Sequence, residues 1–292
     1  MNMKIISKMP AGIPTIESYK KLLRSPLFLE IESFSDRFLE QNKHILTEYS
    51  RKWVSDPLHQ WRRQWEYPFV YANIQLSIIN DKKNSDIKIL DAGSGVTFFP
   101  YYIASTFDHI EVHCCNIDVS LKSIFSNINA NSKFPVNFYS ADIHYLPFKD
   151  NSYDIVYCIS VLEHTKDFEA VIREFKRVLK QNGLLIVTFD ISVDGLADIS
   201  VKKGVELIKM LEKYFCPIDN FNLKQDLDRY ESSNYLCIES VKRYYGRKLF
   251  PRQSFYAKLR FLFKNILKFH TLKTFSNLTV YRITFKNKDN KK

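Results

Sequence analysis

The sequence predicts a doubly wound α/β fold with a mostly parallel sheet, and three observations support that prediction. Short apolar runs alternate with amphipathic stretches between residues 86 and 190, as expected of strands buried on both faces of a parallel sheet. The 292-residue chain is 45% hydrophobic, which is sufficient for a large core. An apolar–polar alternation at 281–286 predicts a half-buried antiparallel last strand.

Residues 1–85 are predicted to form an N-terminal helical cap, and residues 86–292 the main domain. The cap contains all three tryptophans, at 53, 61 and 65. Trp61 and Trp65 are four residues apart, so on a helix they would share a face. Two interpretations stay open. These rings and Tyr67 pack the cap onto the core, or they form a lid that stacks on a substrate while Arg62 or Arg63 pairs with an anion.

Five apolar runs predict the strands of the sheet, at 87–90, 111–117, 136–140, 155–160 and 184–189. Between the last two, apolar side chains recur at helical spacing from Phe168 to Leu179. Gly183 is predicted to end this helix. Strand–helix alternation of this kind requires right-handed crossovers and places ligands beyond the carboxyl ends of the strands.

The basic charge is concentrated near the end of the sequence. The net charge is +11, yet residues 241–292 contain 15 basic residues and one acidic residue. Residues 191–275 are predicted to be a basic helical insertion before the last strand, with an amphipathic helix at 255–269. That helix faces the core with a solvated basic side, contacts an anionic membrane surface, or binds nucleic acid.

Cysteine usage and hydropathy restrict the protein class further. The five cysteines form no CxxC pair, which favours a reducing compartment without disulfides or a zinc site, so no metal is expected. The sequence contains no run of about 18 apolar residues, so no membrane span is predicted. Its first residues lack the apolar core of a signal peptide. We therefore expect a cytoplasmic protein.

The run Asp91-Ala-Gly93-Ser-Gly95 at the end of the first predicted strand indicates a ligand site. Its glycines let the backbone turn sharply and approach a ligand closely. Phe98 stands where a dinucleotide-binding motif requires a third small residue, which disfavours a pyrophosphate. Asp91 would also repel phosphate, and it suits a ligand that carries an ammonium group.

This run resembles motif I of class I S-adenosylmethionine-dependent methyltransferases, of the type 11-like kind. Further segments resemble the same family in its order, namely Asp118 after the second strand, then 141–143, 146–156, 160–164 and 175–187. The resemblance covers about residues 86–190. Thr97 departs from it, since many members have a third glycine there.

The resemblance implies a Rossmann-like fold with S-adenosyl-L-methionine as cofactor. In that family Asp91 would orient the cofactor's amino group, Asp118 would bind the ribose hydroxyls and Asp142 the adenine amine. The full set of implied cofactor-binding residues is Asp91, Gly93, Gly95, Asp118, Ala141, Asp142, Ile143 and Ser160. His164, just past the fourth strand, is the candidate catalytic base, and a structural histidine bonded to a neighbour is the alternative.

Two absences bear on the acceptor. The fourth strand is not followed by the (Asn/Asp)-Pro-Pro-aromatic tetrad of enzymes that methylate nucleic-acid amines, and no proline follows Cys158. A small-molecule or glycan hydroxyl is therefore expected. The 63–69 string also resembles methyltransferases of bacterial surface-glycan gene sets. An RNA methyltransferase that uses the basic region, and a non-catalytic cofactor-binding scaffold subunit, remain as alternatives.

Overall fold

The computed structural model describes residues 8–52, 56–80, 86–197, 199–228, 234–245 and 276–288. The helices are α1 (Ile16–Leu22), α2 (Pro26–Lys52), α3 (Arg63–Asn80), α4 (Phe99–Thr106), α5 (Leu121–Asn131), the 3-10 helix η1 (Leu162–His164), α6 (Phe168–Val178), α7 (Val201–Tyr214), α8 (Leu223–Asp228) and α9 (Ile238–Tyr245). The strands are β1 (Ile87–Ala92), β2 (Ile110–Asn116), β3 (Asn137–Ser140), β4 (Tyr153–Ile159), β5 (Leu179–Ser192), β6 (Phe215–Pro217) and β7 (Leu278–Asn287).

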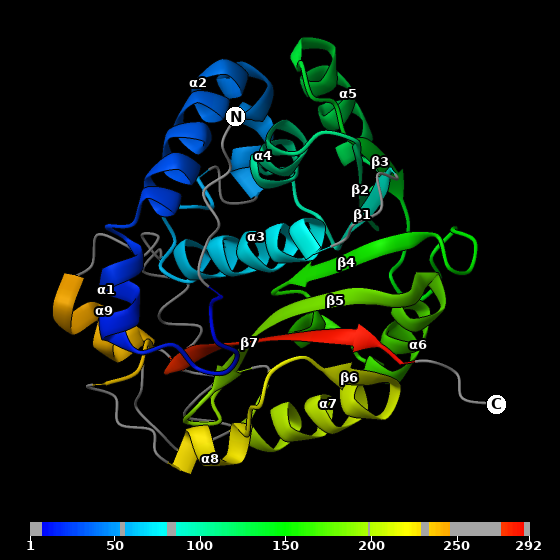
Figure 1. Cartoon of the computed structure of the whole chain (residues 1–292). Helices are drawn as coiled ribbons and strands as arrows, with labels where there is room; N and C mark the ends of the chain where they lie inside the picture. The colour runs from blue at the N-terminus through cyan, green and yellow to red at the C-terminus, as the bar shows by residue number, and fades with distance from the viewer. Residues whose placement is uncertain are drawn as a thin grey trace.

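These strands form one seven-stranded sheet in the order β3-β2-β1-β4-β5-β7-β6 (Figure 1). The pairs from β3 to β5 are parallel, and β7 runs antiparallel to both β5 and β6. The strand order reverses between β1 and β4, where ligands bind in sheets of this kind. The predicted doubly wound fold with an antiparallel last strand is confirmed.

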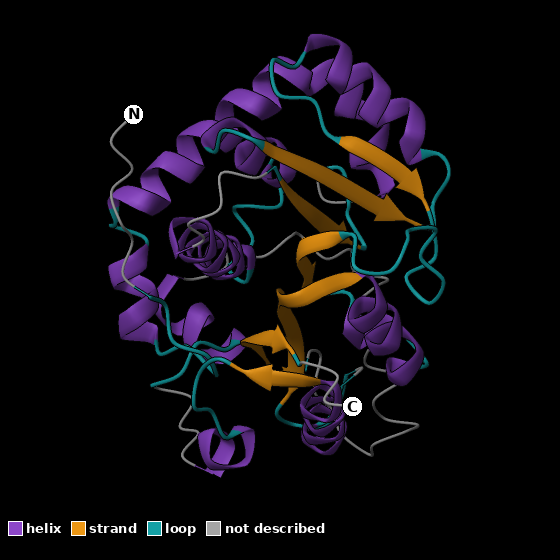
Figure 2. Ribbon diagram, turned by 45° about the vertical axis from the view of Figure 1, so that its right-hand side comes forward, coloured by secondary structure: helices purple, strands orange, loops and turns teal. Residues whose placement is uncertain are grey.

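Both faces of the sheet are buried, which explains the continuous apolar runs. Successive side chains of a strand point to opposite faces, so β1 places Ile87 and Ile89 in one core and Leu90 and Ala92 in the other. The first core also takes apolar side chains from α1 to α5, and the second from α6 to α8. Figure 2 shows helices on both sides of the sheet.

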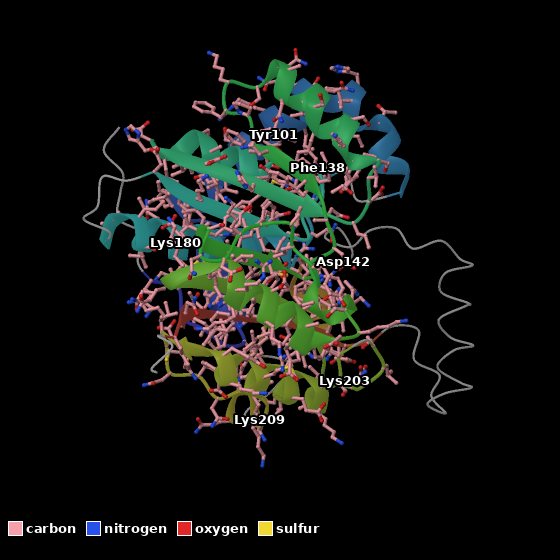
Figure 3. All side chains as sticks on the ribbon, turned by 90° about the vertical axis from the view of Figure 1, so that its right-hand side faces the viewer. Tyr101, Phe138, Asp142, Lys180, Lys203 and Lys209 are labelled. Atoms are coloured by element: carbon pink, nitrogen blue, oxygen red, sulfur yellow. The ribbon has the colours of Figure 1, made fainter. Side chains whose placement is uncertain are left out.

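The helix α7 has one buried and one exposed face. Side chains of α7 at the sheet, such as Leu207 and Leu211, are buried, whereas Lys203 and Lys209 point outward at the end of the molecule opposite Tyr101 (Figure 3). Ser200 caps the N-terminus of α7 by accepting a hydrogen bond from the Lys203 N–H.

Some boundaries differ from the prediction. The helix α6 ends at Val178 and β5 begins directly at Leu179, so Gly183 lies inside β5 and does not end the helix. A Cβ on Gly183 would lie 2.9 Å from the Asp154 carbonyl oxygen, which explains the glycine by close packing instead. The three-residue strand β6 was not predicted. The predicted amphipathic helix at 255–269 lies outside the described residues, and the division at residue 85 stays a prediction.

Candidate functional site

The implied cofactor-binding residues lie along one edge of the sheet, at the carboxyl ends of β1 to β4. Backbone hydrogen bonds connect neighbouring strand ends, from the Gly93 N–H to the Cys115 carbonyl and from the Ala141 N–H to the Asn116 carbonyl. The Asn116 side chain also donates to the Ser94 carbonyl at 2.9 Å. Residues far apart in the sequence are thus brought together at the point where the strand order reverses.

The loop after β1 requires glycine at position 93. Gly93 has φ +84°, and an added Cβ would lie 2.7 Å from Val161 Cγ2, so both backbone conformation and packing exclude a side chain. The loop also contacts the N-terminal cap. The Tyr49 hydroxyl of α2 accepts a hydrogen bond from the Val96 N–H at 3.0 Å, a contact that the sequence did not indicate.

Asp91 has the properties required of a carboxyl group that receives an ammonium ion. Its residue is only 7% exposed, and it makes no ion pair within the described part of the chain. Burial raises the pKa of Asp91 to about 7. A cation placed beside it would restore the ionised form, so this buried carboxyl group fits the amino group of S-adenosylmethionine.

Asp118 and Asp142 follow β2 and β3 and are partly exposed, so a ligand can reach both carboxylates. Asp118 Oδ1 accepts hydrogen bonds from the backbone N–H and the hydroxyl of Ser120. Asp142 Oδ1 accepts from the backbone N–H and the Nδ1 of His144, and the backbone hydrogen bond lowers the pKa of Asp142 despite partial burial. Ala141 and Ile143 flank Asp142 as buried apolar side chains suited to a flat ring.

Ser160 and His164 follow β4. Ser160 adopts φ +49°, an unusual conformation for a residue with a side chain, and such strain gathers at functional sites. His164 closes η1 and is exposed. The structure therefore places both residues beside the strand-order reversal, with the backbone of Ser160 turned sharply. The role of His164 as a base stays a prediction.

The first turn of α3 is joined to β4 and β5 by a buried carboxylate that the sequence did not reveal. Glu66 is fully buried and accepts hydrogen bonds from Arg63 (2.7 Å), Ser160 Oγ (2.7 Å) and Thr188 Oγ1 (2.5 Å). Burial raises the pKa of Glu66, but the Arg63 charge and the two hydroxyl hydrogen bonds outweigh it and keep the pKa low. This ionised group connects the cap to the strained residue at the site.

A second carboxyl group, Glu163, lies beside this network. Its Oε1 accepts a hydrogen bond from the Asp190 backbone N–H at 3.1 Å. Burial and the charge of Glu66 raise the pKa of Glu163 to about 8, although Arg62 and Arg63 act in the opposite direction. Asp190 Oδ2 forms an ion pair with Arg62. The only sequence signal for Glu163 was its place next to His164.

The tryptophan-rich segment packs against the core in this structure. Trp61, Trp65 and Tyr67 are each at most 4% exposed. A shared helix face was expected if Trp61 and Trp65 lay on one helix, but Trp61 precedes α3 and only Trp65 lies on it. The Trp65 ring lies 4.0 Å from the guanidinium carbon of Arg282, itself buried in β7. The packing interpretation is therefore favoured over the lid.

Three further features concern metals, membranes and disulfides. Within the described ranges, no three His, Cys, Asp or Glu side chains cluster as metal ligands. In the same part of the chain, no helix combines the length and apolar character needed to cross a bilayer. All five cysteines are free thiols, and Cys216 alone is exposed.

Comparison with known proteins finds similarity in the central region of the chain. Residues 90–187 match the model of a family described as a methyltransferase domain. An uncharacterized protein of Methanocaldococcus jannaschii is 35% identical over 118 residues, which are 40% of this chain and 47% of that protein. Phosphoethanolamine N-methyltransferase 3 of Arabidopsis thaliana is 30% identical over 101 residues, 35% of this chain and 20% of that enzyme. The chain thus spans less than half the length of these curated relatives.

A solved structure of phosphoethanolamine N-methyltransferase 2 from Haemonchus contortus, in complex with S-adenosyl-L-methionine, resembles this chain with a TM-score of 0.49. The two sequences are 17% identical, and the match covers 88% of this chain and 60% of that one. Similarity at this level carries no conclusion about the acceptor.

Proposed function

We propose that this chain is a class I methyltransferase that uses S-adenosylmethionine and methylates a small-molecule or glycan acceptor at a hydroxyl group. The match of residues 90–187 to a methyltransferase-domain family supports this proposal. The observation that carries the cofactor site is Asp91, a buried carboxyl group beside the Gly93 turn that has no ion pair among the described residues. S-adenosylmethionine supplies an electrophilic methyl group on a sulfonium when it is bound.

The residues of this chain would supply binding and alignment. Asp91 orients the amino group, the Gly93 and Gly95 backbone passes the methionine portion, and Asp118 accepts from the ribose hydroxyls. Ala141, Asp142 and Ile143 hold the adenine, and Ser160 contributes its backbone. Alignment of this kind can lower the barrier of a displacement reaction by about 7–11 kcal/mol. His164 is the proposed proton acceptor.

An acceptor nitrogen is the second candidate, supported by the Arabidopsis relative that is named for N-methylation of phosphoethanolamine. Titration calorimetry with S-adenosylmethionine tests the cofactor site. Formation of S-adenosylhomocysteine with fractionated metabolites and oligosaccharides tests the acceptor. If the purified chain does not bind S-adenosylmethionine, the proposed function is wrong.

We also propose that the enzyme acts in the cytoplasm, at the inner face of the membrane if residues 255–269 bind anionic lipid. Free thiols support a reducing compartment. A fluorescent fusion and cell fractionation would test this location.

A further inference from the structure

A surface cavity lies between α1 and α9, two helices that are far apart in the sequence. Its volume is about 270 Å³, and it is lined by Lys20, Leu23, Arg24, Tyr244 and Tyr245. Because one water molecule occupies about 30 Å³ of the liquid, the cavity can take a small polar group with part of the molecule that carries it. None of the residues assigned to the cofactor lines this cavity.

Backbone hydrogen bonds hold the two helices next to each other. The Ile16 N–H, at the start of α1, donates to the Asn234 carbonyl at 2.9 Å. The Leu236 N–H, just before α9, donates to the Pro14 carbonyl at 2.8 Å. Figure 1 shows α1 and α9 side by side at the left of the molecule. The cavity is therefore formed by two elements whose relative position is fixed.

The cavity lies toward the edge of the sheet that holds the cofactor residues. Thr279 of β7 pairs with Ile191, close to the carboxyl end of β5. Its Oγ1 donates to the Leu236 carbonyl at 2.7 Å, directly before α9. The helix α9 thus begins where β5 ends, at the same edge as the ends of β1 to β4.

A buried aromatic contact supports the cavity from behind. The ring of Tyr245 packs edge-on against that of Tyr19, with the two centroids 5.8 Å apart, and Tyr19 is fully buried. The Tyr19 hydroxyl donates a hydrogen bond to Gln64 of α3. Tyr245 is itself half-buried, so its ring is held on one side and lines the cavity on the other.

The two cations of the cavity have no carboxylate partner. Neither Lys20 nor Arg24 forms an ion pair within the described part of the chain, and no acidic residue lines the cavity. The Lys20 ammonium lies 3.8 Å from the centre of the Tyr244 ring, a contact that positions its charge without neutralising it. Burial raises the pKa of Tyr245, and the nearby charge of Arg24 acts against this rise.

The charged residues of both helices are distributed in the same direction. The first turns are acidic, with Glu17 on α1 and Glu239 on α9. The last turns, which lie at the cavity, are basic, with Lys20 and Lys21 on α1 and Lys242 and Arg243 on α9. The cavity therefore lies in a local positive field, which favours an anionic ligand.

A phosphate monoester matches these groups in charge and in hydrogen bonding. It carries about −1.5 to −2 charges at pH 7 and can balance two cations, whereas a carboxylate carries only one charge. Its three oxygens accept hydrogen bonds, and the ammonium, the guanidinium and the two phenol hydroxyls can donate them. The planar fork of Arg24 also suits two phosphate oxygens at once.

We propose that the cavity between α1 and α9 binds a phosphate monoester group, carried by a soluble metabolite or by a phospholipid head group. Lys20 and Arg24 bind the phosphate oxygens, and the Tyr244 and Tyr245 hydroxyls donate further hydrogen bonds. This inference does not depend on the proposed function, because the anion can be bound and measured without the cofactor.

The first test uses titration calorimetry with the full chain and no cofactor. The probe is sn-glycerol 3-phosphate, and D-glycerate and glycerol are the matched carboxylate and neutral compounds. The phosphate monoester should bind at least about tenfold more tightly than D-glycerate, because it carries more charge and accepts more hydrogen bonds. Glycerol should show no measurable binding.

The second test distinguishes a lipid source from a soluble one. Sedimentation with phosphatidylcholine vesicles that contain phosphatidic acid is compared with vesicles that contain phosphatidylserine at equal charge. Phosphatidic acid presents a phosphate monoester, and phosphatidylserine does not. Preference for phosphatidic acid, lost on substitution of Lys20 and Arg24, would assign the cavity to a lipid head group. Binding of sn-glycerol 3-phosphate without this preference would assign it to a soluble ester.

Lys20→Gln and Arg24→Gln should each raise the Kd of the phosphate ligand about fivefold or more, because each loses a charge-assisted hydrogen bond. The double variant should show no measurable binding. Arg24→Lys keeps the charge but loses the fork, so its Kd should lie between those of the wild type and Arg24→Gln. Lys203→Gln combined with Lys209→Gln is the matched control. It removes two exposed charges from α7, away from the cavity (Figure 3), and should change nothing.

The inference is wrong if the wild-type chain binds neither sn-glycerol 3-phosphate nor phosphatidic acid in preference to phosphatidylserine. It is also wrong if D-glycerate binds as tightly as the phosphate, or if the double variant binds the phosphate like the wild type. Thermal melting identifies any variant that fails to fold. Arg24 is exposed, so Arg24→Gln and Arg24→Lys then decide the question. Failure to bind S-adenosylmethionine would contradict the proposed function alone.

Discussion

At the scale of single residues, the sequence was most informative where backbone conformation restricts the choice of amino acid. The Asp91–Gly95 motif could be located because its glycines and the apolar run before it are close together in the sequence. Glu66 could not be recognised as a site residue, because its partners Ser160 and Thr188 are 94 and 122 residues away. Burial of a carboxylate depends on such distant pairing and leaves no local pattern.

Gly93→Ala should destabilise the loop after β1 and weaken cofactor binding. The change imposes φ +84° on a residue with a side chain, at about 1–3 kcal/mol, and adds a collision with Val161. Gly195→Ala is the matched control, because Gly195 has φ +72° but open space where a Cβ would lie. Urea denaturation should therefore show a larger loss for Gly93→Ala. An equal loss of unfolding free energy in both variants would show that the collision with Val161 does not contribute.

Asp118→Ala should weaken S-adenosylmethionine binding, because a carboxylate at the end of β2 would lose its hydrogen bonds to the ribose. Hydrogen bonds to charged groups contribute about 1.5–3 kcal/mol each, so Kd should rise tenfold or more. Calorimetry measures this directly. Unchanged affinity would exclude Asp118 from the site.

His164→Ala should lower turnover and remove one limb of the pH–rate profile if His164 accepts the proton of the substrate. Steady-state rates across pH provide the measurement, with cofactor affinity as the control for folding. Full turnover with the wild-type pH profile would end the base proposal.

At the scale of elements, the strands were predictable and the attachment of the cap was not. Strands buried on both faces form apolar runs, whereas β6 has three residues and no pattern. The first turn of α3 faces the sheet with polar side chains, because Glu66 reaches Ser160 and Thr188 there. Neither Arg62 nor Arg63 is free for an anion, since each pairs with a carboxylate of the chain itself.

Thr188→Val should destabilise the fold and loosen α3. The shape of the side chain is retained, but Glu66 loses a donor while it remains buried, at a cost of about 1–3 kcal/mol. Chemical denaturation and hydrogen exchange of α3 amides would measure the effect. Ser123→Ala, on the exposed side of α5, is the control. A variant as stable as the control would show that Glu66 does not anchor the cap.

At the scale of the whole molecule, the net charge of +11 is not spread evenly along the chain. Outside residues 241–292 the acidic residues slightly outnumber the basic ones, with 31 against 28. Most of the basic stretch lies outside the described residues, so its role stays a prediction. A basic charge confined to one segment favours contact with an anionic membrane surface or an anionic acceptor over general binding to nucleic acid.

Wild-type protein should sediment with anionic vesicles at low salt if residues 255–269 contact a membrane. Replacement of Lys258, Arg260, Lys264 and Lys268 by Glu should abolish this binding, because the attraction is electrostatic. Neutral vesicles are the control. A wild-type protein that stays in the supernatant would contradict the membrane interpretation, and retention of RNA on filters with a steep salt dependence would favour the RNA alternative.

The position of β7 has a consequence for biosynthesis. It leaves the ribosome after β1 to β6, yet it lies between β5 and β6 in the finished sheet. Until it emerges, the nascent chain presents the long apolar edge of β5 without a partner, and such edges pair readily with other chains. The cell must therefore protect a sheet that is already almost complete, and a truncation just before β7 would leave that sheet open to aggregation.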